Sequence, residues 1–287
     1  MISLVRRYPA ISLFVLAVIF GTAPIVPVAA GWLPPGFDQL SALSASLAGI
    51  VLAAVLGGRS GVLALVKRGA IWRVGVRWWL FVLLFPAIPT LAALFLGGAL
   101  GGNRVGLTGI GTPLSLIGTI AFLTVFAGLG EEFGWRGFAL PRLQTRHSAL
   151  AASLIIGVLH WLWHTPLFFV KGVSQYDLVQ QIGFVPAFLG YGLLVVGSAV
   201  QLSWIFNNTG GSVLLAAVYH GALNGWNGYI DIMRAGMPAA FAYTGLMVAV
   251  SAILVIRFGA RDLSRAAGRI QSEAVGSRSG RPERSRT

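Results

Sequence analysis

The chain has 287 residues, of which 56% are hydrophobic and 10% are charged, and its formal net charge is +13. Soluble domains contain about 25% charged residues, so this composition excludes an ordinary soluble enzyme and is typical of a polytopic membrane protein. The absence of cysteine excludes disulfides, thiol catalysis and cysteine-ligated metals. Because the basic residues lie between and beyond the apolar runs, they favour cytoplasmic loops over a nucleic-acid partner.

Apolar runs indicate how often the chain crosses the bilayer. A helix needs about 17 to 25 residues to span a hydrocarbon core of ~30 Å. The sequence predicts eight such runs, which together form a single membrane domain over residues 1–258. In chain order they are 11–30, 43–58, 78–100, 114–130, 149–170, 183–205, 211–226 and 239–258.

The first run raises the question of a cleavable signal peptide. Arg6 and Arg7 precede it, and the small residues at 28–30 resemble a cleavage site. The apolar stretch is, however, longer than a usual signal core and contains Pro24 and Pro27. We therefore predict a retained first helix.

The segments between the runs differ in character. Residues 65–79 interleave basic residues with tryptophans, which indicates an anchor at the inner headgroups. Residues 101–112 are glycine-rich and nearly uncharged, and read as an outer connection. Residues 259–287 are rich in Arg, Ser and Gly, and we expect a basic, disordered cytoplasmic tail.

The distribution of charge predicts the topology. With eight crossings and a cytoplasmic amino terminus, the inner segments hold 18 of the 21 basic residues. The outer loops hold only Arg104, Lys171 and Arg234. This asymmetry favours a multi-pass protein of the cell membrane with both termini in the cytoplasm.

Two adjacent acids and an arginine stand at the end of the fourth run. Glu131 and Glu132 account for two of only eight acidic residues, and ionisable groups in membrane segments usually face a protein interior or a water-filled cavity. Arg136 is four residues from Glu132, so the two can pair on one helix face. Glu131 is rotated by about 100° from Glu132 and is free to point into a cavity.

Three of the four histidines fall within predicted helices. His160 and His164 are four residues apart in the fifth run, and His220 precedes Asn224 by four residues in the seventh. His147 falls in a basic loop, where a solvated role is expected. At a rise of 1.5 Å per residue, His160, His220 and Glu131 lie about 13 to 16 Å from the inner ends of their helices.

This set of groups suits hydrolysis. A carboxylate and imidazoles around a water allow general-base attack on an amide carbonyl, and Asn224 with a second histidine can stabilise the oxyanion. The same groups suit zinc, in which case Glu131, His160 and His220 are the expected ligands, although the preferred interpretation needs no cofactor. The residues alone leave a metal-bound and a glutamate-activated water open.

The order of the motifs resembles one known family. Glu131-Glu132-x-x-x-Arg136, a histidine motif in the next helix and His220-x-x-x-Asn224 resemble the CAAX prenyl protease 2 group, also called the CPBP or Abi family of intramembrane endopeptidases. The resemblance covers about residues 114–226. Its second motif falls on residues 156–160, where Ile156 replaces the usual phenylalanine, and His164 is additional.

The resemblance implies an all-α fold of about eight transmembrane helices around a cytoplasm-facing cavity. It implies that Glu131, His160, His220 and Asn224 are catalytic, with Glu132, Arg136 and His164 in support. The implied substrate is a membrane-associated or lipid-modified protein or peptide in contact with membrane lipid. Two alternatives use the same cavity: a proton-coupled transporter, or a non-catalytic peptide-binding or bacteriocin-immunity protein. No oligomeric state is predicted.

Overall fold

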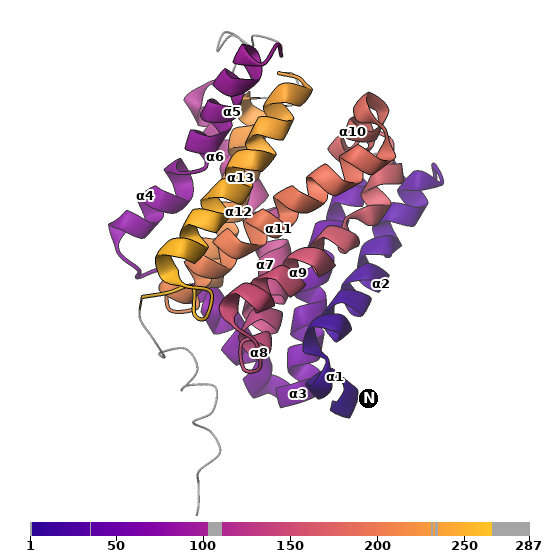
Figure 1. The fold of residues 1–287 in the computed structure, drawn as a ribbon. Helices are drawn as coiled ribbons and strands as arrows, with labels where there is room; N and C mark the ends of the chain where they lie inside the picture. The colour runs from indigo at the N-terminus through magenta and orange to yellow at the C-terminus, as the bar shows by residue number, and fades with distance from the viewer. Residues whose placement is uncertain (1, 35, 103–110, 231, 233–234, 266–287) are drawn as a thin grey trace, which may run out of the picture.

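A computed structural model describes residues 2–34, 36–102, 111–230, 232 and 235–265, and no β-strand occurs among them (Figure 1). The long helices pack side by side as a bundle. In chain order, the helical elements are α1 (Ile2–Arg7), α2 (Pro9–Ala29), η1 (Phe37–Leu43), α3 (Ser44–Lys67), η2 (Arg68–Ala70), α4 (Val76–Leu84), α5 (Ala87–Ala99), α6 (Pro113–Leu123), η3 (Thr124–Leu129), α7 (Gly130–Glu132), η4 (Phe133–Ala139), α8 (Leu140–Leu143), α9 (Ala149–Trp163), η5 (Thr165–Phe169), α10 (Ser174–Ile182), α11 (Phe184–Asn208), α12 (Val213–Ile230) and α13 (Met237–Phe258).

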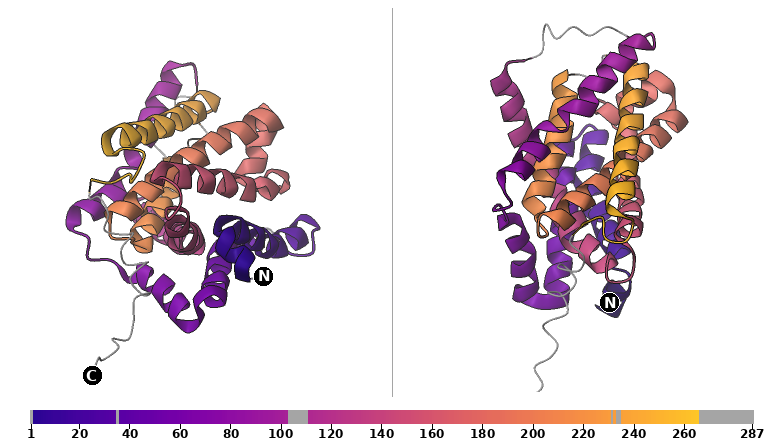
Figure 2. Two further views of the ribbon diagram at one scale, coloured as in Figure 1. Left: turned by 60° about the horizontal axis from the view of Figure 1, so that its bottom comes forward. Right: turned by 60° about the vertical axis from the view of Figure 1, so that its left-hand side comes forward.

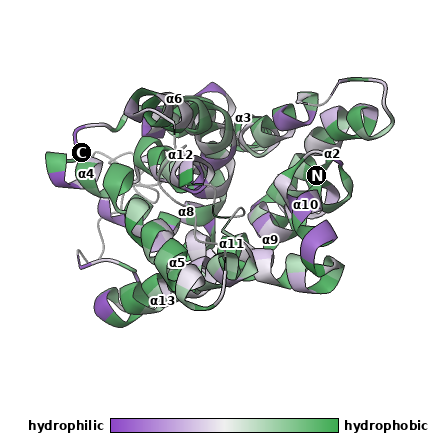
Figure 3. Cartoon of the chain, turned by 90° about the horizontal axis from the view of Figure 1, so that it is seen from above, coloured by the Kyte–Doolittle hydropathy of each residue, from purple (hydrophilic) through white to green (hydrophobic). Residues whose placement is uncertain are grey.

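The prediction of an all-α polytopic membrane protein is confirmed. Within the described residues, seven helical runs are long and apolar enough to cross a membrane, and much of the helical ribbon has the colour of hydrophobic residues (Figure 3). These runs are Pro9–Ala29, Phe37–Ala70, Val76–Ala99, Pro113–Leu143, Ala149–Phe169, Phe184–Asn208 and Met237–Phe258. The remaining predicted run, 211–226, forms most of α12.

Helix α12 is more polar than the other long helices because little of it needs to meet lipid. It packs against α4, α6, η3 and α11 in the middle of the bundle (Figures 1 and 2). Most of its residues are buried, including Tyr219, which has no exposed surface. Its polar groups therefore face protein and an internal cavity, where a polar side chain costs less than it does in hydrocarbon.

Helix α3 is interrupted at Gly58, where the predicted run 43–58 ends. Gly58 has φ 55° and ψ −146°, a conformation that is strained for residues with a Cβ. Gly61 lies against the carbonyl of Ala53. Because residues eight apart in a straight helix are about 12 Å apart, the chain must fold back on itself after Gly58. Residues 59–67 therefore form a short return helix instead of an extension of the span.

The run from α6 to α8 is continuous but is not a regular α-helix. Two π-helical stretches, η3 and η4, stand on either side of α7, which carries the two acids. A Cβ on Gly128 would overlap the carbonyl oxygen of Ala217 in α12, and one on Gly134 would overlap that of Ala45 in α3. These contacts between small residues hold the irregular run tightly between its neighbours.

A buried polar network joins three helices beside α7. The hydroxyl of Tyr219 in α12 donates to Oε1 of Gln201 in α11. Gln201 Nε2 donates to the Met247 carbonyl in α13 at 2.9 Å and to Ser251 Oγ at 3.1 Å. Ser251 Oγ in turn donates to the Gly197 carbonyl at 2.8 Å. The network thus ties α11, α12 and α13 together.

Hydrogen bonds define one end of the bundle, which we call the basic end. Arg146 Nη1 donates to the Arg7 carbonyl at 3.0 Å, and the Ala149 amide donates to the Arg261 carbonyl at 2.7 Å. Asn207 Nδ2 donates to the Asp262 carbonyl at 2.9 Å. The described ends of the chain therefore lie at the same end (Figure 1). The first residues of the predicted tail pack here, and residues 266–287 lie outside the described residues.

The opposite end, which we call the far end, is formed by the chain after α2 and by the starts of α6, α11 and α13. It also holds α10, a short helix that the sequence analysis treated as part of an outer loop. Gln175 Nε2 of α10 donates to the Tyr191 hydroxyl of α11 at 3.0 Å, which fixes this helix against the bundle. Of the predicted outer loop 101–112, residues 103–110 lie outside the described residues.

Candidate active site

The two acids of α7 are buried and point to different partners, as their spacing predicts. Glu131 retains 4% of its surface and Glu132 retains none. Glu131 faces α9 and a large cavity, whereas Glu132 faces Arg136 and α12. The two neighbouring carboxylates therefore occupy separate environments and are suited to separate roles.

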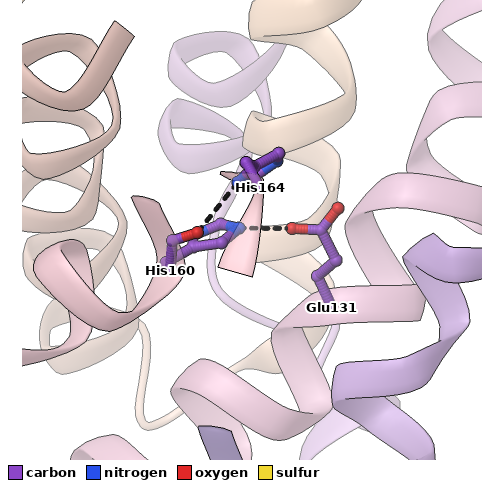
Figure 4. A group of neighbouring side chains, drawn as sticks. All are labelled: Glu131, His160 and His164. Carbon is purple, nitrogen blue, oxygen red and sulfur yellow. Dashed lines mark hydrogen bonds and ion pairs between the residues drawn. The ribbon is translucent and has the colours of Figure 1, made fainter. Parts of the chain in front are cut away.

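Glu131 contacts His160 of α9, and His164, the residue that follows α9, lies beside them (Figure 4). His160 Nε2 lies 2.6 Å from Glu131 Oε2, and His164 Nδ1 lies 2.9 Å from the His160 carbonyl oxygen. A neutral His160 protonated at Nε2 donates to the carboxylate, which leaves Glu131 Oε1 without a hydrogen bond from the described residues. Of His160 and His164, it is His160 that contacts Glu131 directly.

The predicted pair of Glu132 and Arg136 is present. Arg136 Nη1 lies 3.1 Å from Glu132 Oε1 and 3.0 Å from Oε2, and both side chains are completely enclosed. His220 Nδ1 lies 2.8 Å from the same Oε1. Glu132 therefore joins the fourth run to α12 and also orients the His220 ring.

His220 lines the same cavity as Glu131 and His160, but its own hydrogen-bonding partner is Glu132. Its ring centroid lies 6.3 Å from that of His160. The depths of these residues along their helix axes were predicted well enough to place them at one level in the membrane. Depth does not specify in which direction around the axis a side chain points, and this direction determines whether His220 bonds to Glu131 or to Glu132.

Asn224 and His220 lie on the same face of α12, and both line the cavity. Asn224 is exposed and its amide makes no hydrogen bond with the described part of the chain. A side-chain amide in this state is free to donate to a group inside the cavity. His147, in contrast, is exposed in the loop between α8 and α9, as the sequence analysis expects.

Three aromatic residues, which the spacing of the motifs did not identify, complete the site. Trp135 stacks on His160 with ring centroids 5.0 Å apart, and Tyr191 meets His164 edge-on at 5.2 Å. The Trp163 indole donates to the Ala17 carbonyl of α2 at 3.3 Å. Together they hold the two histidine rings in place. Because tryptophans and tyrosines are common in membrane helices, no sequence signal distinguishes these from lipid-interface residues.

The cavity has a volume of about 1210 Å³ and extends from Glu131 to the far end. Glu131, His160, His164, His220 and Asn224 line its inner part. Its part toward the far end is lined by η1, by the start of α6, by α10 and by the start of α13, including Gln39, Ser115, Gln181 and Met237. A cavity of this size is sufficient to admit part of a peptide chain.

The direction of the cavity corrects one sequence expectation. Both termini and the cavity were expected to face the cytoplasm. The described ends of the chain lie at the basic end, whereas the cavity extends to the far end. The two features therefore cannot both face the cytoplasm. The sequence predicts the distance of the site residues from the helix ends. It does not predict at which end of the bundle large side chains close the cavity.

A metal site would use a different set from the one expected. One donor atom each from Glu131, His160 and His164 lie within 4.8 Å of one another, whereas the expected set contained His220 in place of His164. Ligands on one tetrahedral zinc ion are roughly 3.3 Å apart. Since Glu131 and His160 are only 2.6 Å apart, these residues fit zinc only after that hydrogen bond opens.

Comparisons with known proteins agree with the location of the site. Residues 113–226, from α6 into α12, match the family described as type II CAAX prenyl endopeptidase Rce1-like. A protein of Methanococcus maripaludis named CAAX prenyl protease 2 is 28% identical over 137 residues, which make up 48% of this chain and 49% of that protein. The chain thus matches about half the length of that relative.

Proposed function

We propose that this chain, whose residues 113–226 match the Rce1-like family of type II CAAX prenyl endopeptidases, is an intramembrane endopeptidase that cleaves a peptide bond with a water activated by Glu131. The observation that carries the proposal is the state of the Glu131 carboxylate. It lies at the inner part of a large cavity, one oxygen is held by His160, and the other receives no hydrogen bond from the residues that the structure describes.

In the proposed reaction Glu131 acts as the general base. Its free oxygen takes a proton from a water in the cavity, and the water oxygen forms a bond to the scissile carbonyl carbon. When the carbon–nitrogen bond breaks, the protonated Glu131 returns the proton to the leaving amine. The carboxylate is regenerated, and one water is consumed for each bond cleaved. His160 acts as a positioning residue that fixes the carboxylate through the 2.6 Å hydrogen bond.

The oxyanion formed in this step needs donors at the cavity wall. The unpaired amide of Asn224 is the best-placed donor on α12, and a single such donor is commonly worth about 10²–10³ in kcat. His220 lies one helical turn away, oriented by Glu132 at 2.8 Å. Arg136 is completely enclosed and paired with Glu132, so its role is to hold this acid and not to contact substrate.

The protein is an integral multi-pass membrane protein, and we propose that both of its termini are cytoplasmic. The support is the predicted charge asymmetry: once the enclosed Arg136 is set aside, 17 of the other 20 basic residues fall in segments that an eight-crossing chain places on one side. The proposed substrate is a membrane-associated or lipid-modified peptide or protein, which reaches the site while in contact with the bilayer.

The test is a comparison of cells that produce wild-type protein, Glu131→Gln and His147→Ala. We expect cleavage products in the first and third strains and none in the second, because Gln cannot accept the proton. His147 is a matched control, since it is a histidine of the same chain outside the site. Equal products from Glu131→Gln and wild type, with equal amounts of protein in the membrane, would refute the role of Glu131.

The close donors of Glu131, His160 and His164 favour a second mechanism, in which these three residues hold a zinc ion. Such an ion would polarise the carbonyl and lower the pKa of a bound water. His164 offers Nε2, because its Nδ1 is engaged by the His160 carbonyl. Stoichiometric zinc in the purified protein that is lost in His164→Ala, together with inhibition by a chelator, would establish this mechanism in place of the first.

A further inference from the structure

The site is closed toward the basic end. Between Glu131 and that end, the side chains of Trp135, Phe138 and Leu140 have no exposed surface, and Phe206 of α11 is equally enclosed. No residue of the segments 59–75, 144–150 or 206–213, which form the basic end, lines the cavity. Within the described residues, the cavity thus connects the site with the far end and not with the end that holds the described ends of the chain.

The charge asymmetry remains after the structure is taken into account. Arg136 is enclosed in the membrane region and is not a loop charge. Setting it aside leaves thirteen basic residues in the described part of the chain, of which twelve lie in segments of the basic end. The segments that carry Arg59, Lys67, Arg68 and Arg146 are short, which is the range in which Lys and Arg determine orientation. At the far end, Lys171 is the one basic side chain within the described ranges.

From these two observations together we infer that the basic end faces the cytoplasm and that the cavity opens on the non-cytoplasmic face of the membrane. Given the proposed peptidase function, on which this part rests, the substrate is an exported peptide or the outer segment of a membrane-anchored protein. A protein end presented at the cytoplasmic surface would have no path to Glu131 through the enclosed aromatic floor.

The cavity lining also constrains the charge of the substrate. Its described lining includes three acids, Asp38, Asp177 and Glu131, and no lysine or arginine, although the whole chain carries +13. Asp177 is exposed on α10, near the mouth. Such a surface attracts basic peptides and disfavours acidic ones, since the low-dielectric walls of a cleft strengthen the field of its charges. The inferred substrate is therefore neutral or basic as well as non-cytoplasmic.

Site-directed thiol labelling tests the orientation without relying on activity. The chain contains no cysteine, so single cysteines can be introduced into an unmodified background. Gln39→Cys and Gln181→Cys place a thiol on η1 and on α10, where both residues line the cavity and are exposed. Ser60→Cys and Thr145→Cys place one at the basic end, also on exposed residues. Two positions at each end protect the test against a variant that fails to fold.

Each variant is exposed to a membrane-impermeant maleimide in intact bacterial spheroplasts and after permeabilisation. We expect the two mouth cysteines to label to the same extent under both conditions, and the two basic-end cysteines to label only after permeabilisation. The reverse pattern, or labelling of the mouth cysteines only after permeabilisation, overturns the inference. This outcome would leave the peptidase proposal standing, because Glu131→Gln is tested separately by its products.

Discussion

Replacing Arg136 by methionine removes a cation from a completely enclosed ion pair while keeping much of the side-chain volume. In the wild type, Arg136 Nη1 lies 3.0 Å and 3.1 Å from the two oxygens of Glu132, and neither side chain is exposed. The variant leaves the Glu132 carboxylate with His220 as its remaining polar partner. The expected result is a large loss of stability, because a buried charge without its counterion is expensive.

The magnitude follows from the burial. Breaking one side of a buried pair costs about 3–5 kcal/mol, and His220 offsets part of that cost, so we expect about 3 kcal/mol. At about 2–4 °C per kcal/mol for a chain of this size, Tm falls by roughly 6–12 °C. The double variant Glu132→Gln/Arg136→Met contains no uncompensated charge. It should lose only about 1–2 kcal/mol, the cost of missing hydrogen bonds, and should therefore be more stable than Arg136→Met.

The assay is unfolding of the detergent-purified protein, followed by circular dichroism for wild type, both single variants and the double variant. The order of stability is the decisive readout, because a general packing defect would make the double variant the least stable. A loss below about 1 kcal/mol in Arg136→Met would show that the pair is not enclosed as described. A double variant less stable than Arg136→Met would contradict the electrostatic explanation.

Three further substitutions test the packing and the site. Gly134→Ala should cost about 1–3 kcal/mol in thermal unfolding because its Cβ overlaps α3, whereas Gly245→Ala, which has nothing within 4 Å, should cost nothing; equal losses would contradict the close approach. Gly58→Ala should cost about 1–2 kcal/mol more than Gly57→Ala in the same measurement, because only Gly58 has a positive φ. Asn224→Ala should lower kcat about 10²–10³-fold with KM little changed, and an unchanged kcat would remove Asn224 from the oxyanion site.

The sequence predicts the helices well because length and hydropathy follow directly from the thickness of the bilayer. All eight predicted runs form helices, and α12 is the least apolar because protein surrounds it. The i,i+4 pairing of Glu132 and Arg136 follows from local geometry alone and is present. The fold-back at Gly58 and the helix α10 were not predicted, since a single glycine and a short amphipathic segment occur in loops of many kinds.

The directions of side chains were harder to predict than their depths. Two π-helical stretches surround α7, and each changes the angular position of the residues that follow it. No periodicity in the sequence reveals them, so the hydrogen bond of His220 with Glu132 could not be predicted. The mouth of the cavity was misplaced for a related reason. The end of the bundle at which side chains close the cavity is determined by the rotamers and contacts of large residues such as Trp135. Hydropathy does not encode these contacts.

The buried network around Gln201 affects the orientation of His220, although it makes no contact with this residue. Tyr219 and His220 are neighbours on α12, about 100° apart around its axis. With the Tyr219 hydroxyl bound to Gln201, and Gln201 bound to α13, α12 can neither rotate nor slide by a turn without breaking these bonds. The Gln201 side chain of α11 thus fixes the rotation of α12, and this rotation determines the direction in which the His220 imidazole points in the cavity.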